Sequence, residues 1–200
     1  MKKLFGLFLL FIISLTNINN AFSISPDVFI QSTVNRASQL LSKNISKDDK
    51  MSQLKLIAKE TVDIRGIGFY SLGAAKKSLN ENQKKTYSDL FEKYFLKSFA
   101  SRLAEYTNPE IEVKNKQVLN NNYTIVNSIL VGTAERPEVN IDWRVYTKNP
   151  DSPLIRDLII EGLSLVRTQK EEFSSVLNSN DNDINALFKV LEDFSKNQNF

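Results

Sequence analysis

A change in hydrophobic spacing near residue 110 constrains the fold of this chain more than any other feature of its sequence. Beyond that point apolar residues recur at every second position, which is the spacing of half-buried β-strands. The segments are short and are separated by turn-forming residues, so antiparallel neighbours are favoured. Four consecutive strands, forming an antiparallel meander, are therefore expected over residues 111–119, 123–133, 138–147 and 154–166.

Helical signals stand before and after these strands. Apolar residues there recur with the spacing of an amphipathic helix, and several helix starts have recognisable caps. Helices on both sides of a meander define an α+β fold, and without repeats or linkers residues 24–200 are expected to form a single domain. The expected helix starts lie at Ser25 and Pro26, Ser46 and Asp49, Asn80 and Gln83, and Asp183.

Residues 1–23 have the pattern of a secretory signal peptide. Lys2 and Lys3 precede an apolar run over residues 4–15, and the sequence Ala-Phe-Ser at 21–23 fits a cleavage site. The apolar run is too short to span a bilayer, which takes about 20 residues. We therefore expect cleavage after this segment and an exported, soluble protein; an uncleaved anchor is the alternative.

The chain contains neither cysteine nor histidine. This absence excludes disulfides, thiolate nucleophiles, Ser-His-Asp triads and His-ligated metal sites, so no catalytic residue, metal or cofactor is expected. The chain has 26 basic and 23 acidic residues, and loss of Lys2 and Lys3 with the leader lowers its net charge from +3 to near +1. Nucleic-acid binding requires a concentrated basic face, so no nucleic-acid partner is expected.

Three short motifs match known sites only in part. Residues 66–73 contain G-x-G, but the third glycine comes too late for a dinucleotide-binding fingerprint. Residues 52–55 read S-x-x-K without the companion motifs of a serine acyltransferase. Residues 181–183 lack the glycine and the closing glutamate of a calcium loop. Ordinary helices and helix caps are the better interpretation of all three.

The third expected strand has two chemically different faces. Ile141, Trp143 and Val145 share one parity, whereas Asp142 and Arg144 share the other. The pattern fits either a half-buried strand with an Asp/Arg pair for cross-strand contacts or a strand whose apolar face lines a pocket. The fourth strand is apolar on both faces, so its second face needs a helix, a partner or a ligand over it.

The fourth strand runs into a helix without an intervening loop. Leu163, Leu165 and Val166 have the character of strand residues. Thr168 and Glu171 then fit a T-x-x-E capping box, in which each side chain satisfies a backbone N–H of the first helical turn. We expect these two residues to have a structural role.

The strand and the junction just described, IDWRVY and RDLIIEGLSLVRTQKEEFSSVL, resemble the signature region of the MlaC family, also called the toluene-tolerance auxiliary family. Upstream, Asp63, the pair Leu72 and Gly73, and Gln83 four residues before Tyr87 resemble the pattern of that family. The resemblance covers nearly the whole chain after the leader, and its C-terminal part is the most specific.

The resemblance implies a phospholipid carrier of the periplasm, not an enzyme. A curved sheet and helices, arranged as an NTF2-like cone, would enclose an apolar cavity that holds a glycerophospholipid by its acyl tails. The carrier, a monomer, would exchange lipid between an outer-membrane lipoprotein/porin complex and an inner-membrane ABC transporter complex with an MCE-domain subunit, which maintains outer-membrane lipid asymmetry. Lys76 and Leu154 stand where the family often has aromatic residues, which leaves pocket shape and partner contacts open.

Strand parity together with this resemblance predicts which side chains contact the lipid. They come from the third helix and from all the strands but the first. The residues expected to bind lipid are Phe91, Phe95, Phe99, Ile129, Val131, Ile141, Trp143, Val145, Ile159, Leu163 and Leu165.

Two other functions remain open at this point. A periplasmic protein-binding module or lipoprotein chaperone would cover a segment of its partner with the apolar sheet face and would co-purify with protein. An enzyme on a similar fold would use a buried aspartate, such as Asp142 or Asp157, as a general base with a raised pKa. Headgroup preference, the number of bound tails and the direction of transport are not encoded in any pattern found.

Overall fold

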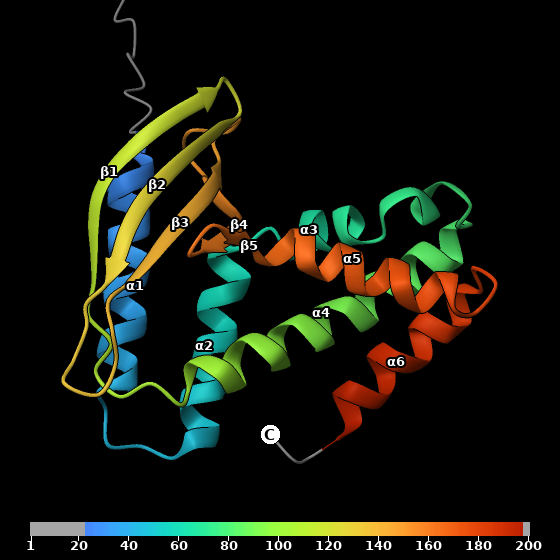
Figure 1. The fold of residues 1–200 in the computed structure, drawn as a ribbon, viewed down its shortest axis with the longest axis horizontal. Helices are drawn as coiled ribbons and strands as arrows, with labels where there is room; N and C mark the ends of the chain where they lie inside the picture. Colours follow the sequence, from blue (N-terminus) through green and yellow to red (C-terminus); the bar gives the residue numbers. More distant parts are fainter. Residues whose placement is uncertain (1–22, 198–200) are drawn as a thin grey trace, which may run out of the picture.

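The computed structural model describes residues 23–197, so the expected signal peptide lies outside the described residues apart from its last position. Helices precede an antiparallel sheet and two helices follow it (Figure 1), which confirms the α+β prediction. The elements are α1 (Pro26–Leu41), α2 (Lys47–Thr61), α3 (Ile64–Ser71), the 3₁₀ helix η1 (Gly73–Lys77), α4 (Glu81–Leu103), β1 (Ile111–Asn120), β2 (Tyr123–Leu130), β3 (Val139–Tyr146), β4 (Leu154–Ile160), β5 (Leu163–Ser164), α5 (Leu165–Asn178) and α6 (Ile184–Lys196).

The sheet is a meander of five strands in the order β1-β2-β3-β4-β5, each antiparallel to the next. The expectation of four strands, with one continuous strand over residues 154–166, was wrong. Glu161 and Gly162 turn the chain with φ angles of 48° and 80°, so β5 folds back on β4. Glycine adopts positive φ without steric cost, which makes this position suited to a tight turn.

Most of the predicted helix caps are present. Asn80 and Gln83 form a reciprocal capping box at α4, with N···O distances of 2.9 and 3.0 Å. Ser46 accepts a hydrogen bond from the Asp49 N–H at the start of α2, and Asp183 caps α6. The prediction of these three starts is confirmed. Their capping signals are local and need no tertiary contact, so they can be read from the sequence.

The core is one extended cluster that includes both the sheet and the helices. In Figure 1 the sheet and α1 lie at one end of the molecule, α5 and α6 lie at the other, and α4 crosses between them. Buried side chains of every helix except η1, and of β2, β3 and β4, belong to this main cluster. A smaller cluster joins α1 and α2 to the C-terminal part of α4. The apolar interior is therefore continuous between the sheet and the helical end.

Candidate functional site

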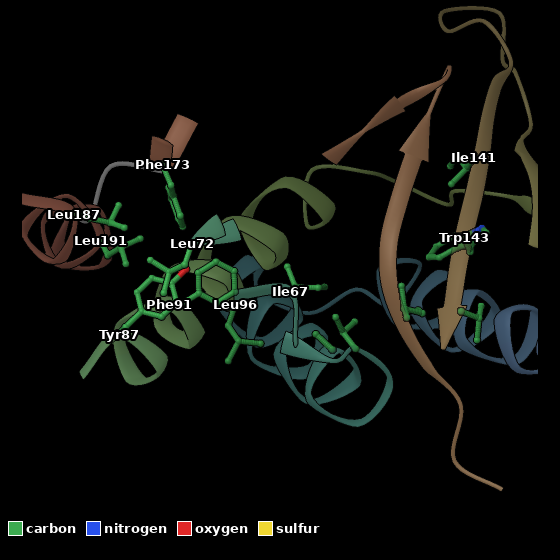
Figure 2. Close-up of a cluster of buried hydrophobic side chains, with 14 of the residues drawn as sticks. Ile67, Leu72, Tyr87, Phe91, Leu96, Ile141, Trp143, Phe173, Leu187 and Leu191 are labelled. Carbon is green, nitrogen blue, oxygen red and sulfur yellow. The ribbon is translucent and has the colours of Figure 1, made fainter. Parts of the chain in front are cut away.

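The inner face of the sheet is the face that carries Ile141, Trp143 and Val145. These residues are 8%, 9% and 0% exposed. The Trp143 Nε1–H donates to Ser128 Oγ at 2.8 Å, and that hydroxyl donates to the Ile141 carbonyl at 2.9 Å. Figure 2 shows Ile141 and Trp143 on β3, with the labelled helical residues gathered on one side of the strand. Both hydrogen bonds span β2 and β3, so they hold the indole at a set position on this face.

Helix α4 carries an aromatic column, formed by Tyr87, Phe91, Phe95 and Phe99. The four-residue spacing places these rings on one side of the helix. Successive ring centroids are 5.7, 6.1 and 5.9 Å apart. The Tyr87 hydroxyl donates to the Gly68 carbonyl at 2.8 Å, so its polar end is satisfied inside the core. Burial raises the pKa of Tyr87 and keeps its phenol neutral.

Burial changes along the aromatic column. Tyr87 and Phe91 are buried, whereas Phe95 and Phe99 are half-buried and pack against the main cluster. Leu158, which is half-buried on β4, packs against the same cluster and is the cross-strand partner of Trp143. Apolar surface that is neither fully buried nor freely exposed therefore occurs on both α4 and the sheet.

Two of the residues predicted to bind lipid lie on the outer face of the sheet. Ile129 is paired with Asn140, and Ile159 is paired with Asp142. Their parity is therefore opposite to that of Trp143, and both are half-buried. Sequence reasoning grouped them with Trp143 because β2 and β4 are apolar on both faces. Leu158, on the inner face, was not among the residues predicted to bind lipid, because β4 is apolar at both parities and its sequence alone does not show which parity faces inward.

The C-terminal members of the predicted set are exposed. Leu163, in β5, is 59% exposed, and Leu165, the first residue of α5, is 38% exposed. The expectation that Leu165 and Val166 continue a strand was wrong, since both belong to α5. Val131 follows β2 and is half-buried, with its N–H donating to the Glu110 carbonyl at 2.8 Å.

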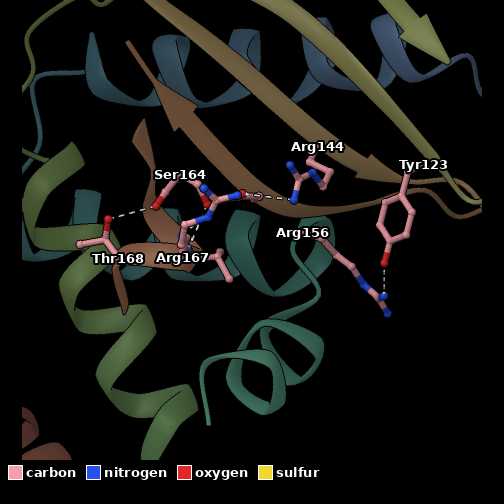
Figure 3. Close-up of polar contacts among 8 residues, drawn as sticks. Tyr123, Arg144, Arg156, Ser164, Arg167 and Thr168 are labelled. Carbon is pink, nitrogen blue, oxygen red and sulfur yellow. Dashed lines mark hydrogen bonds and ion pairs between the residues drawn. The ribbon is translucent and has the colours of Figure 1, made fainter. Parts of the chain in front are cut away.

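Asp157 joins β4 to the start of α5. Its carboxylate is only 3% exposed. One oxygen accepts from the Ser164 hydroxyl at 2.7 Å and lies 3.6 Å from an Arg144 nitrogen, and the other accepts from the Val166 N–H at 3.2 Å. Figure 3 shows this group of polar contacts beside the sheet. Both carboxylate oxygens are engaged in structural contacts, which does not suit Asp157 as a general base.

Ser164, and not Thr168, caps α5. The Ser164 hydroxyl accepts from the Arg167 N–H at 3.1 Å, whereas Thr168 Oγ1 donates to the Ser164 carbonyl at 3.1 Å (Figure 3). The predicted capping box of Thr168 and Glu171 was therefore wrong. The helix begins one turn earlier because Asp157 binds the N–H of its second residue and the hydroxyl of its cap. Phe173 and Leu177, which have the four-residue spacing of an amphipathic helix, are the buried residues of α5.

Arg156 connects β4 to α3. Its Nε donates to Asp63 at 2.6 Å, one terminal nitrogen donates to the Tyr123 hydroxyl at 2.7 Å, and its guanidinium lies 3.8 Å from the Tyr146 ring centroid. Burial alone would lower the pKa of Arg156, but the hydrogen bonds to Tyr123 and Asp63 outweigh it and the pKa is raised. Asp63 also caps α3 by accepting from the Gly66 N–H at 2.8 Å.

Two hollows open on the surface, and neither is apolar. One of about 540 Å³ lies between α3 and α5, where Tyr70, Arg167 and Lys170 are among its lining residues. The other, of about 470 Å³, lies between α1 and β1 beside Gln31 and Asn35. Neither hollow is lined by a residue that was predicted to bind lipid. The predicted residues with the most apolar surroundings belong instead to the main cluster.

Two further properties concern residues 23–197 only. No three side chains of His, Cys, Asp or Glu come close enough together there to hold a metal ion. Among the helices of the same range, none combines the length and the apolar character needed to cross a membrane.

Comparison with known proteins gives one family and one fold. The family model described as MlaC protein matches residues 31–193. No curated protein matches the chain. Among solved structures, a phospholipid-binding protein from Ralstonia solanacearum, in complex with a phospholipid, is similar with a TM-score of 0.72 and 17% sequence identity. The similarity covers 86% of this chain and 97% of that protein.

Proposed function

The chain belongs to the MlaC family, and from that premise we propose that it binds a phospholipid by its acyl tails between the inner face of the sheet and α4. The observation that carries this proposal is the half-buried apolar surface on both layers, at Phe95 and Phe99 on α4 and at Leu158 on β4. The solved protein of the same fold, whose complex contains a phospholipid, supports the same class of ligand.

The tails would enter by parting contacts within the main cluster. The members of the main cluster pack against one another, and neither of the two hollows described above is apolar. Half-buried side chains make fewer contacts than fully buried ones, so their displacement costs less. Phe95 and Phe99 would therefore move first, and Ile141, Trp143 and Val145 would form the opposite wall, which completes a cone-shaped enclosure.

A carrier of this kind overcomes a large energetic barrier to the movement of lipid through water. Two 16-carbon tails expose about 28 methylenes, and at ~0.8 kcal/mol each their exposure to water costs more than about 20 kcal/mol. A protein cavity as apolar as a bilayer makes transfer between membrane and carrier nearly isoenergetic. The carrier itself then needs no nucleotide site. With the headgroup left in water, selectivity among headgroups is expected to be weak.

The proposed setting is the periplasm, reached through the signal peptide of residues 1–23. There the protein would exchange lipid between an outer-membrane lipoprotein/porin complex and an inner-membrane ABC transporter complex with an MCE-domain subunit. This exchange would maintain the lipid asymmetry of the outer membrane. The family membership supports this assignment, and the absence of cysteine and histidine agrees with a binding protein.

Native mass spectrometry of the purified protein, followed by lipid extraction, tests the proposal. We expect near-stoichiometric diacyl phospholipid on the wild type and its loss from a Phe99→Glu variant, because a charge on the tail-binding surface is costly to bury. Val190→Glu is the matched control, since Val190 is 44% exposed on α6 and lies outside the proposed site. Both variants must keep the far-ultraviolet circular dichroism of the wild type.

A wild-type protein that carries no lipid and takes up none from phosphatidylethanolamine/phosphatidylglycerol vesicles would refute phospholipid binding. A protein-binding module would then be the better explanation of the protein's function. Equal lipid loading of the Phe99→Glu and Val190→Glu variants would retain the ligand but reject the proposed site.

A further inference from the structure

The hollow of about 540 Å³ between α3 and α5 is lined by polar side chains that the proposed lipid site does not use. The two helices lie side by side in Figure 1. Tyr70 of α3 stands on one side of the hollow. On α5, spacings of three and four residues make neighbours of Arg167, Lys170 and Glu171, and Ser175 and Asn178 also line the hollow. Its volume is typical of small-molecule sites, which range over about 300–1,000 Å³.

Contacts with α3 and η1 hold the Lys170 side chain in place. Its Nζ lies 5.4 Å from the centroid of the Tyr70 ring, a distance at which a cation and an aromatic face attract each other. Its stem passes over Gly73, where an added Cβ would lie only 3.1 Å from Lys170 Cε. Gly73 has a φ of 59°, which glycine adopts without steric cost. The ammonium group is therefore positioned at the hollow without the help of a carboxylate.

The polar groups of the hollow are available to a ligand. Within residues 23–197, neither Arg167 nor Lys170 takes part in an ion pair. Their hydrogen bonds in that range use backbone atoms only. The Ser175 hydroxyl and the Asn178 amide likewise have no hydrogen-bond partner among these residues. The hollow thus offers two cations and further hydrogen-bonding groups on the same helix.

The charge of the hollow matches that of a monoanion. Arg167 and Lys170 contribute two positive charges and Glu171 contributes one negative charge, so the net charge is +1. A phosphodiester carries one negative charge and has two free oxygens, one for each cation, whereas a phosphate monoester carries about −1.5 to −2. A guanidinium or an ammonium group binds phosphate oxygens strongly. A carboxylate only accepts hydrogen bonds, so a ligand beside Glu171 must supply donors such as hydroxyl groups.

Two further cations stand next to the hollow on η1. Lys76 and Lys77 follow Gly73 by three and four residues, about 6–8 Å along a 3₁₀ helix, and both are exposed. Residues 24–200 carry a net charge of +1, with 24 basic and 23 acidic side chains. The hollow and these two lysines together carry +3, so the rest of that range carries −2. Positive charge is therefore concentrated here, which steers anions toward the hollow.

We propose that this hollow binds a phosphodiester that carries hydroxyl groups, either the phosphoglycerol headgroup of a phospholipid or the same group in a soluble glycerophosphodiester. Arg167 and Lys170 bind the two free phosphate oxygens, and Glu171 accepts a hydrogen bond from a hydroxyl of the ligand. None of the lining residues belongs to the proposed tail-binding surface on α4 and the inner face of the sheet. The proposal therefore does not depend on tail binding.

Isothermal titration calorimetry with soluble glycerophosphoglycerol tests the site. Lys170→Gln and Arg167→Gln each remove one cation, and each should raise the dissociation constant about tenfold through the loss of a charged hydrogen bond. Lys43→Gln is the matched control, because it removes the same charge from an exposed lysine that follows α1 and does not line the hollow. It should leave the dissociation constant unchanged. All three variants should melt at the temperature of the wild type.

Co-sedimentation with vesicles distinguishes the two sources of the ligand. Vesicles of phosphatidylcholine and phosphatidylglycerol present the phosphoglycerol group in a bilayer, and vesicles of phosphatidylcholine alone are the reference. Binding of the soluble probe, weakened by Lys170→Gln, supports the site and shows that a soluble diester suffices. Binding only to the phosphatidylglycerol vesicles, again weakened by Lys170→Gln and not by Lys43→Gln, supports the site and identifies the lipid headgroup as its ligand.

The Glu171→Gln variant tests the match of charge. The wild type should bind glycerophosphoglycerol more tightly than glycerol 3-phosphate, because the monoester brings more negative charge close to Glu171. Removal of that carboxylate raises the net charge of the hollow to +2. Glu171→Gln should therefore bind glycerol 3-phosphate about ten times more tightly than the wild type does.

Three results would overturn the proposal. One is a wild type that binds neither glycerophosphoglycerol nor phosphatidylglycerol vesicles. The second is equal weakening by Lys170→Gln and Lys43→Gln, which would reduce the binding to a general attraction of charge. The third is a wild type that prefers glycerol 3-phosphate to the diester, which would reject a phosphodiester as the ligand.

Discussion

Ser128 and Asp157 show how single buried polar side chains position apolar neighbours. Ser128 links the indole N–H of Trp143 to the backbone of β3. Asp157 links the end of β4 to the first turn of α5. Because an unsatisfied polar group is costly in the interior, each of these bonds restricts the geometry around it. At the scale of residues, these hydrogen bonds therefore fix the positions of the apolar side chains around them, including those of the proposed site.

The hydrogen bond between Trp143 and Ser128 should contribute measurably to the free energy of unfolding. Trp143→Phe removes the indole donor and part of the ring, and should lower the free energy of unfolding by about 2 kcal/mol. Urea denaturation of this variant, of Ser128→Ala and of the double variant checks the expectation. The two effects should couple by about 1 kcal/mol, because the residues share one hydrogen bond. Strictly additive effects would contradict the role given to Ser128.

Asp27 should contribute stability in a defined range of pH. Hydrogen bonds from Lys116 and Ser25 lower the pKa of Asp27 from 3.8 to about 2. A lowered pKa in the folded state means that the contribution is present above the unfolded value and is lost as the pH falls from 3.8 toward 2. The side chain is 35% exposed, so screening limits the contribution to less than about 1 kcal/mol.

The Asp27→Asn variant checks this pH dependence. Its free energy of unfolding in urea should fall below that of the wild type at pH 6 and should match it at pH 2. Added salt should reduce the difference at pH 6, since exposed ion pairs are screened. A difference of the same size at both pH values would show that the charge of Asp27 is not involved.

Among the secondary-structure elements, those with complete local signals were predicted correctly. The starts of α2, α4 and α6 were predicted from caps that span four or fewer residues. The end of the sheet was not, because the segment 154–166 has apolar residues at both parities and periodicity cannot mark where such a strand turns back. The break depends on the positive φ of Glu161 and Gly162 and on the contacts of Asp157. Those contacts join residues of different elements.

The corrected start of α5 leads to a comparison of two alanine variants. Ser164→Ala removes the cap and a bond to Asp157, and should lower the free energy of unfolding by about 1–2 kcal/mol. Thr168→Ala removes only a bond to the Ser164 carbonyl and should cost less than about 0.5 kcal/mol. Thermal or urea denaturation measures both. The reverse order of effects would restore Thr168 as the cap.

At the scale of the whole molecule, the continuous main cluster connects the sheet to the helical end. Trp143 on β3 and Phe91 on α4 both belong to the main cluster, although they lie in opposite parts of the view in Figure 2. Arg156 adds a polar connection between β4 and α3. A ligand inserted between these layers would therefore exchange protein contacts for lipid contacts throughout the molecule, and its effect should be visible in global stability.

Removal of the lipid should lower the melting temperature if the proposed function holds. A ligand present at about 100 times its dissociation constant stabilises the folded state by ~2.7 kcal/mol, which corresponds to about 5–10 °C for a chain of this size. Differential scanning calorimetry of loaded and delipidated protein measures the difference. The Phe99→Glu variant should show no such difference. Equal melting of loaded and delipidated wild type would contradict binding within the core.

Local patterns in the sequence determined the fold class, the meander and most helix starts, since spacing, caps and turn residues act within a few positions. They also indicated the family, whose model matches residues 31–193. Tertiary structure alone decided which of the two faces of an apolar strand is turned inward. Ile159 and Leu158 are neighbours in an apolar strand, yet only the pairing of β4 with β3 places Leu158 beside Trp143. An apolar side chain has no preferred direction until its cross-strand neighbours and the covering helix are in place.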